Sequence, residues 1–160
     1  MKIRKTIRSD IPEVAEIYEN ARRFMRESGN ANQWVERPNE EDVMRDIKDG
    51  KGYVVVSDND EIIGAFYLSL EPDPTYKRID EGEWISNAPY AVIHRIAVKY
   101  HGMGIADFIY NYAYNFRQSV KIDTHRDNAP MQRSLAKNGF KYCGIIYLES
   151  GDERIAFQKV

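Results

Sequence analysis

The chain has 160 residues, and its 23 Lys and Arg nearly balance its 25 Asp and Glu, which gives a formal net charge of −2. This size suits a single domain over residues 1–160, and the scattered basic residues argue against nucleic acid as a partner. No apolar run is long enough to cross a bilayer, and the charged start Met1–Lys5 is unlike a signal peptide, so we expect a cytoplasmic protein without membrane contact.

The first third of the chain predicts one strand and two helices. Alternating side chains at Lys2–Ile7 indicate a half-exposed strand. Asp10 begins a helix in a capping-box pattern, and the apolar stripe of that helix ends near Gly29. Asn39 caps a second, shorter helix that ends at Gly50.

The middle of the chain predicts a hairpin, a long loop and a strand–turn–helix unit. Tyr53–Val56 and Ile62–Leu68 suit the two strands of the hairpin, and Glu71–Ala88 is too long for a simple hairpin loop. The apolar, β-branched run Ala91–Val98 indicates a strand buried on both faces. After a turn with two glycines, helical periodicity covers Ile105–Phe116.

The glycine turn has the composition of an anion-binding loop. Gly102 and Gly104 lack a Cβ, so the main chain there can approach a phosphate closely. The first N–H groups of the following helix point toward the same place, and the helix dipole favours a negative charge. An ordinary tight turn before a helix is the alternative interpretation.

The last third predicts a strand, a helix and a final hairpin. Val120–His125 suits a short strand, and Asn128 is placed to cap a helix over Ala129–Lys137. Phe140–Leu148 and Arg154–Val160 alternate as hairpin strands do. The resulting order, β-α-α-β-β-β-α-β-α-β-β, indicates an α/β protein with a mixed sheet and helices on both faces.

Two motifs resemble the GCN5-related N-acetyltransferase (GNAT) family. The first, His101-Gly102-Met103-Gly104-Ile105-Ala106, is similar to the family's acyl-coenzyme A binding motif, with His101 in place of the usual Gln or Arg. The second consists of Asn128 and, after a helix, Asn138-Gly139-Phe140, which match the family's Asn-rich turn and terminal Gly-Phe. The resemblance implies a GNAT-like, mostly antiparallel sheet with a splayed central strand pair.

The resemblance also implies a function, a co-substrate and the residues that bind it. The implied reaction transfers an acetyl group from acetyl-coenzyme A to a primary amine, for which we expect a small molecule; a non-catalytic acyl-coenzyme A binding module is the alternative. A homodimer is expected by analogy. The implied binding residues are Ile96, Ala97, Val98, His101, Gly102, Met103, Gly104, Ile105, Ala106 and Asn128. Among them, the main-chain N–H groups of Ile96 and Val98 would polarise the thioester.

His94 is the candidate general base. It is the one side chain in the apolar strand that titrates near neutral pH, and some family members carry a histidine at this point. The alternative is a core histidine bonded to a backbone carbonyl. Strand alternation predicts that its neighbour Arg95 faces the other side of the sheet, as an ion-pair partner.

The proton donor is not in its usual place in the sequence. Leu135 occupies the position where many family members have a tyrosine, so Tyr142 in the following strand is the candidate, with Tyr147 and Cys143 as alternatives. Cys143 and the three His show no metal-ligand spacing, so no metal site is predicted.

Three residues are candidates for contact with the acceptor substrate. Trp34 lies in the connection between the first two helices, which helps to wall the acceptor pocket in the family; an aromatic that anchors this loop to the core is the alternative. Trp84 lies in the long loop, of a kind that is often functional. His125 shares one strand face with Asp123 and would line the pocket or orient Asn128.

Overall fold

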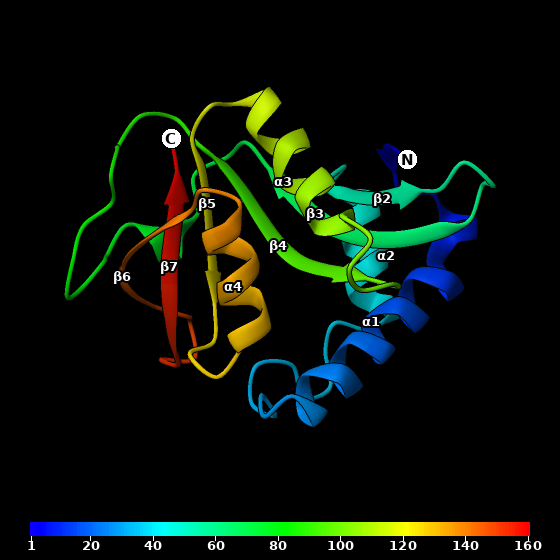
Figure 1. Cartoon of the computed structure of the whole chain (residues 1–160), viewed down its shortest axis with the longest axis horizontal. Coiled ribbons are helices and arrows are strands. Elements are labelled where there is room, and N and C mark those ends of the chain that lie inside the picture. The colour runs from blue at the N-terminus through cyan, green and yellow to red at the C-terminus, as the bar shows by residue number, and fades with distance from the viewer.

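Seven strands form one open sheet in the computed structural model, which describes the whole chain, Met1–Val160 (Figure 1). The strands are β1 (Lys2–Lys5), β2 (Gly52–Val56), β3 (Ile62–Ser69), β4 (Ala91–Val98), β5 (Val120–Thr124), β6 (Lys141–Tyr147) and β7 (Glu153–Lys159). The helices are α1 (Ile11–Glu27), α2 (Glu40–Lys48), α3 (Ile105–Phe116) and α4 (Ala129–Lys137). None of the helices combines the length and the apolar character that crossing a membrane requires.

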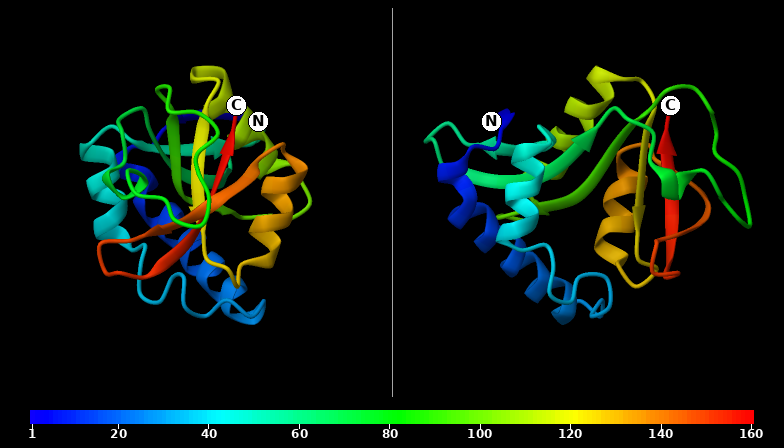
Figure 2. Two further views of the ribbon diagram at one scale, coloured as in Figure 1. Left: turned by 90° about the vertical axis from the view of Figure 1, so that its left-hand side faces the viewer. Right: turned by 180° about the vertical axis from the view of Figure 1, so that it is seen from behind.

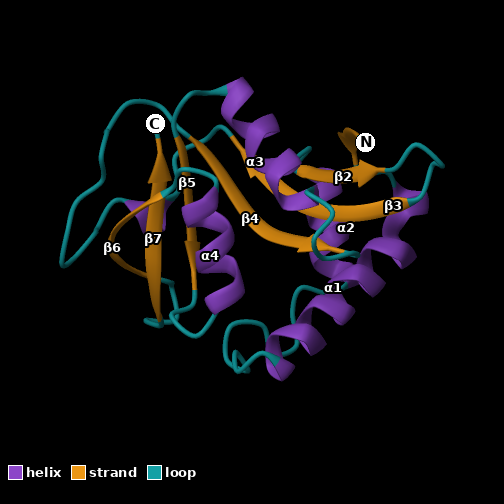
Figure 3. Ribbon diagram, viewed as in Figure 1, coloured by secondary structure: helices purple, strands orange, loops and turns teal.

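The sheet runs in the order β1-β2-β3-β4-β5-β7-β6, and only β4 and β5 are parallel neighbours (Figure 3). The other five neighbouring pairs are antiparallel. The predicted order of elements and the predicted mixed, mostly antiparallel sheet are therefore confirmed.

Helices cover both faces of this sheet, as predicted (Figure 2). On one face, Ile109 of α3 and Leu135 of α4 join the largest core cluster. On the other face, Ile17 of α1 and Val43 of α2 pack against β2 and β3. The loop between β3 and β4 covers the remaining part of this second face, where it packs Tyr76 into a third cluster.

Burial on both faces explains the continuous apolar runs of the inner strands. In β2, Val54 and Val56 pack toward α1 and α2, whereas Val55 between them joins the core under α3. In β4, Val92 packs beneath the long loop, whereas Ile93 joins the α3 core. Because successive side chains of a strand point to opposite faces, a stretch of strand that is covered on both sides is apolar at successive positions.

The central strands β4 and β5 separate soon after they meet. They are paired only at Ala91 with Val120 and at Val92 with Lys121. On the other edge of β4, the register with β3 shifts between Ala65 and Tyr67, and Arg95 has a positive φ of 50°. A bulge therefore bends β4 away from β5, which confirms the predicted splayed pair.

Candidate active site

A cleft of about 320 Å³ opens where β4 and β5 diverge. Its walls come from the α1–α2 loop, β4, β5 and the last hairpin, and include Trp34, His94, Asp123 and Arg154. A narrower groove of about 140 Å³ runs along β4 toward the glycine turn. The cleft and the groove share four lining residues, so they form one continuous depression; these are Met25, Ile96, Asn128 and Met131.

The glycine turn at the far end of the groove is open and rich in free donors. Gly102 and Gly104 have φ values of +74° and +73°, and a Cβ added at either would meet nothing within 4 Å. The N–H groups from Gly102 to Asp107 make no hydrogen bond within the protein, and Gly104 caps α3 without a side chain. Such a run of free N–H groups at a helix N-terminus is suited to binding a phosphate.

The other residues of the turn motif have separate surroundings. His101 stacks on Phe24 of α1 with ring centroids 4.2 Å apart, and both side chains line the groove. Met103 is exposed, whereas the side chain of Ile105 is buried in the core. Ile105 is therefore not part of the groove lining, whereas Ala106 lines the groove directly.

The bulge in β4 turns main-chain donors toward the opening. The N–H of Ala91 donates to Ser119 at the start of β5, at 2.8 Å. The N–H groups of a strand point alternately toward its two edges. In an unbroken strand, the N–H of Lys99 would therefore point toward β5, as that of Ala91 does. It donates instead to Ile63 of β3, at 2.8 Å, because the bulge reverses the alternation. The N–H groups of Ile96 and Val98 consequently point toward the splay.

His94 lies in the cleft between two carboxylates. Its Nε2 is 2.7 Å from Oδ2 of Asp73, and its Nδ1 is 3.7 Å from Oδ2 of Asp123. The side chain of His94 is half-buried, and it also packs beside the rings of Tyr67 and Tyr76. The partners of the imidazole are thus carboxylates and not the backbone carbonyl of the alternative interpretation.

Both carboxylates beside His94 have further donors. Burial by itself would raise the pKa of Asp73, but the hydrogen bonds from His94 and Thr75 outweigh it and lower this pKa to about 2. The hydroxyl of Tyr76 donates to Oδ2 of Asp123 at 2.6 Å, and burial together with this carboxylate raises the pKa of Tyr76 well above its ordinary value. At neutral pH, Asp73 is therefore an ionised acceptor for the proton on Nε2.

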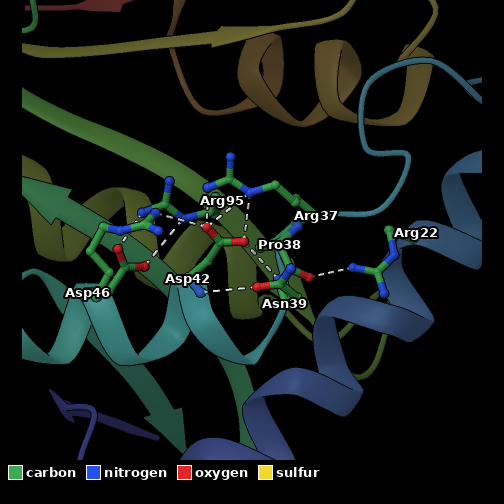
Figure 4. A network of polar contacts seen from close by, with 8 residues as sticks. Arg22, Arg37, Pro38, Asn39, Asp42, Asp46 and Arg95 are labelled. Atoms are coloured by element: carbon green, nitrogen blue, oxygen red, sulfur yellow. Dashed lines mark hydrogen bonds and ion pairs between the residues drawn. The ribbon is translucent and has the colours of Figure 1, made fainter.

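Arg95 does not lie on the opposite face from His94, and this expectation was wrong. Both side chains contact the ring of Tyr67, because the bulge breaks the alternation on which the expectation depended. The predicted ion pair is present: Arg95 binds Asp46 of α2 (Figure 4). Burial raises the pKa of Asp46, although Arg95 opposes this effect.

Ion pairs with Asp42 of α2 anchor the C-terminal end of the α1–α2 loop. Arg37 and Arg45 both bind the buried carboxylate of Asp42, which also accepts the N–H of Asn39 at 2.9 Å (Figure 4). The hydrogen bond from Arg37 outweighs burial and lowers the pKa of Asp42 to about 2. Arg22 of α1 donates to the carbonyl of Pro38 beside this group.

The same loop carries two residues that line the cleft, Trp34, which was predicted from the sequence, and Gln33, which was not. Trp34 lines the cleft and packs edge-on against Tyr18 of α1, so it also anchors the loop. Gln33 was not identified. Its Oε1 accepts hydrogen bonds from Nδ2 of Asn30 at 2.9 Å and from Nδ2 of Asn128 at 3.0 Å. Nothing in the local pattern around Gln33 indicates these contacts.

Asn128 has the capping role that its position predicted. Its Oδ1 accepts the N–H of Met131 at 3.2 Å in the first turn of α4, while its amide group lines both the cleft and the groove. The side chain therefore shapes the junction between the two.

Three other candidate residues are not brought to the cleft. Trp84 lies in the long loop and is buried in the third core cluster, where its Nε1 donates to the carbonyl of Tyr76. His125 lies in the turn before α4, and its Nδ1 accepts the N–H of Asp127 at 3.0 Å. Tyr142 is exposed on β6 and packs edge-on against Phe157. None of these three residues lines the cleft or the groove, so the lining gives no support to the roles predicted for them.

The tyrosine in the groove lining comes from α3. Leu135 is fully buried in the core and provides no polar group. Tyr110 lines the groove, with its hydroxyl 3.3 Å from Oγ of Ser134 on α4. Burial raises the pKa of Tyr110 to about 12, despite the opposing hydrogen bond with Ser134, so the phenol keeps its proton at neutral pH.

Comparisons with known proteins agree with this geometry. The family model described as "Acetyltransferase (GNAT) family" matches residues 13–140. A crystal structure of a GNAT-family acetyltransferase from Streptococcus agalactiae 2603 is 28% identical, with a TM-score of 0.89 over 99% of this chain and 94% of that chain. A GNAT-family acetyltransferase from Listeria monocytogenes 4b F2365 is 16% identical, with a TM-score of 0.72 over 99% of this chain and 93% of that chain, and shows the fold alone. No match was found among curated protein sequences. The family match over most of the chain, together with the splayed strands and the open glycine turn, shows that the chain belongs to the GNAT family of acetyltransferases.

Proposed function

We propose that this chain transfers the acetyl group of acetyl-coenzyme A to the primary amine of a small molecule that binds in the cleft. The main support for the proposal is that the cleft and the groove form one continuous depression. This depression joins a turn with free N–H groups to a site where His94 lies between two carboxylates. The turn suits the co-substrate, and the cleft suits an amine.

The residues along the groove fit acetyl-coenzyme A, which supplies an activated acetyl thioester. The N–H groups of Gly102, Met103, Gly104 and Ile105 would hold its diphosphate, because they have no acceptor in the protein. Side chains along the groove would contact its pantetheine arm, namely those of Ile96, Ala97, Val98, His101, Ala106 and Asn128. This assignment leaves the cleft free for the acceptor.

His94 is proposed as the general base. Asp73 is ionised and accepts from Nε2, so Nδ1 is the nitrogen with a free lone pair. The carboxylates of Asp73 and Asp123 would attract the ammonium form of the acceptor, and His94 would then take its proton directly or through one water. The N–H groups of Ile96 and Val98 would stabilise the oxyanion that forms at the attacked carbonyl.

Tyr110 is proposed as the proton donor to the departing thiolate, in place of Tyr142. It is the only tyrosine that lines the cleft or the groove, and it holds its proton at neutral pH. Trp34 is proposed to contact the acceptor, since it lines the cleft from the α1–α2 loop.

The test incubates the protein with acetyl-coenzyme A and a panel of primary amines, and follows free thiol release together with thermal stabilisation by coenzyme A. Thiol release that depends on an amine supports the proposal. Stabilisation by coenzyme A without thiol release on any amine favours a non-catalytic acyl-coenzyme A binding module. The absence of both effects rejects the proposed co-substrate.

A further inference from the structure

Two basic side chains of the chain are buried, and neither has an ion-pair partner; they are Lys121 and Arg154. The Nζ of Lys121 lies over the rings of Trp84 and Tyr90, at 4.1 and 4.0 Å from their centroids. These aromatic faces compensate part of its charge. Lys121 does not line the cleft, so its charge is accounted for within the protein.

Arg154 has no such compensation. It is 8% exposed, no aromatic ring lies under its guanidinium, and no carboxylate lies within ion-pair distance. Its one hydrogen bond runs from Nη1 to the carbonyl of Glu153, at 2.9 Å. A guanidinium has five N–H donors, so most of them lack a partner in the protein. No nitrogen of Arg154 is both fully buried and without a partner, so the unpaired donors keep contact with solvent and are available to a ligand.

The unpaired donors of Arg154 face the cleft. Arg154 lines it, and Arg95, the other arginine in the lining, is already bound to Asp46. In the antiparallel register, Asp123 is opposite Ala156, which places Arg154 two residues along on the same face as Asp123. Despite this proximity the two do not pair; Oδ2 of Asp123 accepts a hydrogen bond from Tyr76 and lies 3.7 Å from Nδ1 of His94.

The cleft therefore contains acidic side chains and an unpaired basic side chain. Asp73 and Asp123 flank His94, and Arg154 presents free donors in the same lining. We propose that the acceptor is a primary amine that also carries a carboxylate, with the ammonium group beside Asp73 and Asp123 and the carboxylate bound by Arg154. A planar carboxylate satisfies the forked guanidinium through two parallel hydrogen bonds.

The anion that Arg154 binds belongs to the acceptor and not to the co-substrate. Arg154 lines the cleft but not the groove. The free N–H groups for a diphosphate lie at the opposite end of the groove, from Gly102 onward. This inference rests on the proposed function, since it assigns the substrate class of the same site.

The test compares amino acids with their carboxamides as acceptors. The probes are α-amino acids and ω-amino acids of increasing chain length, each beside its neutral amide, and the readout is kcat/KM from thiol release. The amine of an α-amino amide is less basic than that of its acid, so without carboxylate recognition the amide reacts at least as fast. We expect the preferred acid to exceed its amide by about 100-fold, the range measured for buried charge pairs. Arg154→Gln abolishes this preference, and Arg154→Lys, which keeps the charge, retains part of it.

The matched control is Arg126→Gln. Arg126 is an exposed arginine outside the cleft lining that binds Glu153, and its loss leaves the preference intact. Equal kcat/KM for acids and amides in the wild-type protein, or a preference that persists in Arg154→Gln, overturns the inference while amine acetylation stands.

A binding measurement separates this inference from the proposed function. The same amino acids are titrated by calorimetry into the protein saturated with coenzyme A. Binding that requires the carboxylate and Arg154, but without thiol release, supports carboxylate recognition by Arg154 and rejects the transfer reaction. No binding of any amino acid and no turnover overturns the inference as well.

Discussion

Gln33, in the loop between α1 and α2, accepts a hydrogen bond at 3.0 Å from Nδ2 of Asn128, the residue that caps α4. The two residues are 95 positions apart in the chain and both line the cleft. The same Oε1 also accepts from Nδ2 of Asn30 and from Oγ1 of Thr124 at 3.3 Å. One amide oxygen thus holds the loop against the β5–α4 side of the cleft.

Replacing Gln33 by Ala should loosen this side of the cleft. The amide groups of Asn30 and Asn128 lose their common acceptor, and the free energy of unfolding should fall by about 1–2 kcal/mol. Hydrogen exchange of residues 30–38 should become faster, and KM for the amine should rise more than kcat falls. Chemical denaturation, exchange and steady-state kinetics measure the three effects.

The control for this change is Gln132→Ala in α4. Gln132 donates to the carbonyl of Arg126 at 2.8 Å and does not line the cleft. Its loss should leave exchange in the α1–α2 loop unaltered. Unchanged exchange in Gln33→Ala as well would show that other contacts hold the loop.

Replacing Gly104 by Ala should weaken coenzyme A binding more than it weakens the fold. At a φ of +73° an Ala costs about 1 kcal/mol of stability, while its Cβ meets nothing within 4 Å in the protein. The new methyl group instead occupies the approach to the free N–H groups of the turn. We expect Kd for coenzyme A, measured by calorimetry, to rise at least about tenfold, which corresponds to about 1.4 kcal/mol.

Gly151→Ala is the matched control for this substitution. Gly151 has a φ of +90° and equally open surroundings, but it lies in the last hairpin, between β6 and β7. The two variants should lose similar stability, and only Gly104→Ala should lose affinity. Equal affinities in both variants would remove the turn as the diphosphate site.

The strand–turn–helix unit could be predicted in detail, because its signals are local. An apolar run, two glycines and a helical stripe gave the bounds of β4 and α3 as Ala91–Val98 and Ile105–Phe116, and the structure has the same bounds. A cap residue similarly placed α4 at Ala129–Lys137. The bulge at Arg95 has no such signal, since it depends on how β4 meets β3 and β5.

The partners of the cleft residues could not be predicted, because they come from distant parts of the chain. Asp73 reaches His94 from a loop whose path is set by packing of Tyr76 beneath it. Arg154 enters the cleft because β7 inserts between β5 and β6. Residue type alone made Trp84 and His125 candidates for contact with the acceptor, but neither lines the cleft in the folded chain.

Replacing His94 by Ala should impair catalysis and leave co-substrate binding intact. Loss of a general base lowers kcat by about 10²–10⁴-fold. The residual activity should depend less on pH across the range in which the wild-type protein is active, because a general base works only in its deprotonated form. Thiol release across this pH range measures both effects, and calorimetry with coenzyme A checks that its affinity is unchanged.

His125→Ala provides the control for this prediction. His125 lies outside the cleft lining and bonds only within its own turn through the side chain. Its replacement should leave kcat and the pH profile as in the wild-type protein. A wild-type rate in His94→Ala would exclude His94 as the base.

Replacing Lys121 by Met should stabilise the fold at neutral pH. Burial lowers the pKa of Lys121 from 10.5 to about 8, so the folded state binds the proton less tightly than the unfolded state. Below pH 8 this difference lowers the free energy of unfolding of the wild-type protein by about 3 kcal/mol. The rings of Trp84 and Tyr90 offset part of this loss, so we expect Lys121→Met to raise the free energy of unfolding by about 1–2 kcal/mol. Wild-type stability recovers as pH rises from 8 toward 10.5, because the folded lysine is then neutral while the unfolded one is still charged. Urea unfolding should therefore show a smaller gain at pH 9.5 than at pH 7.

Lys159→Met is the control, because Lys159 is a half-buried lysine over the ring of Tyr114. This variant should show no such gain in stability. A Lys121→Met protein that is less stable than the wild-type protein at pH 7 would contradict the prediction.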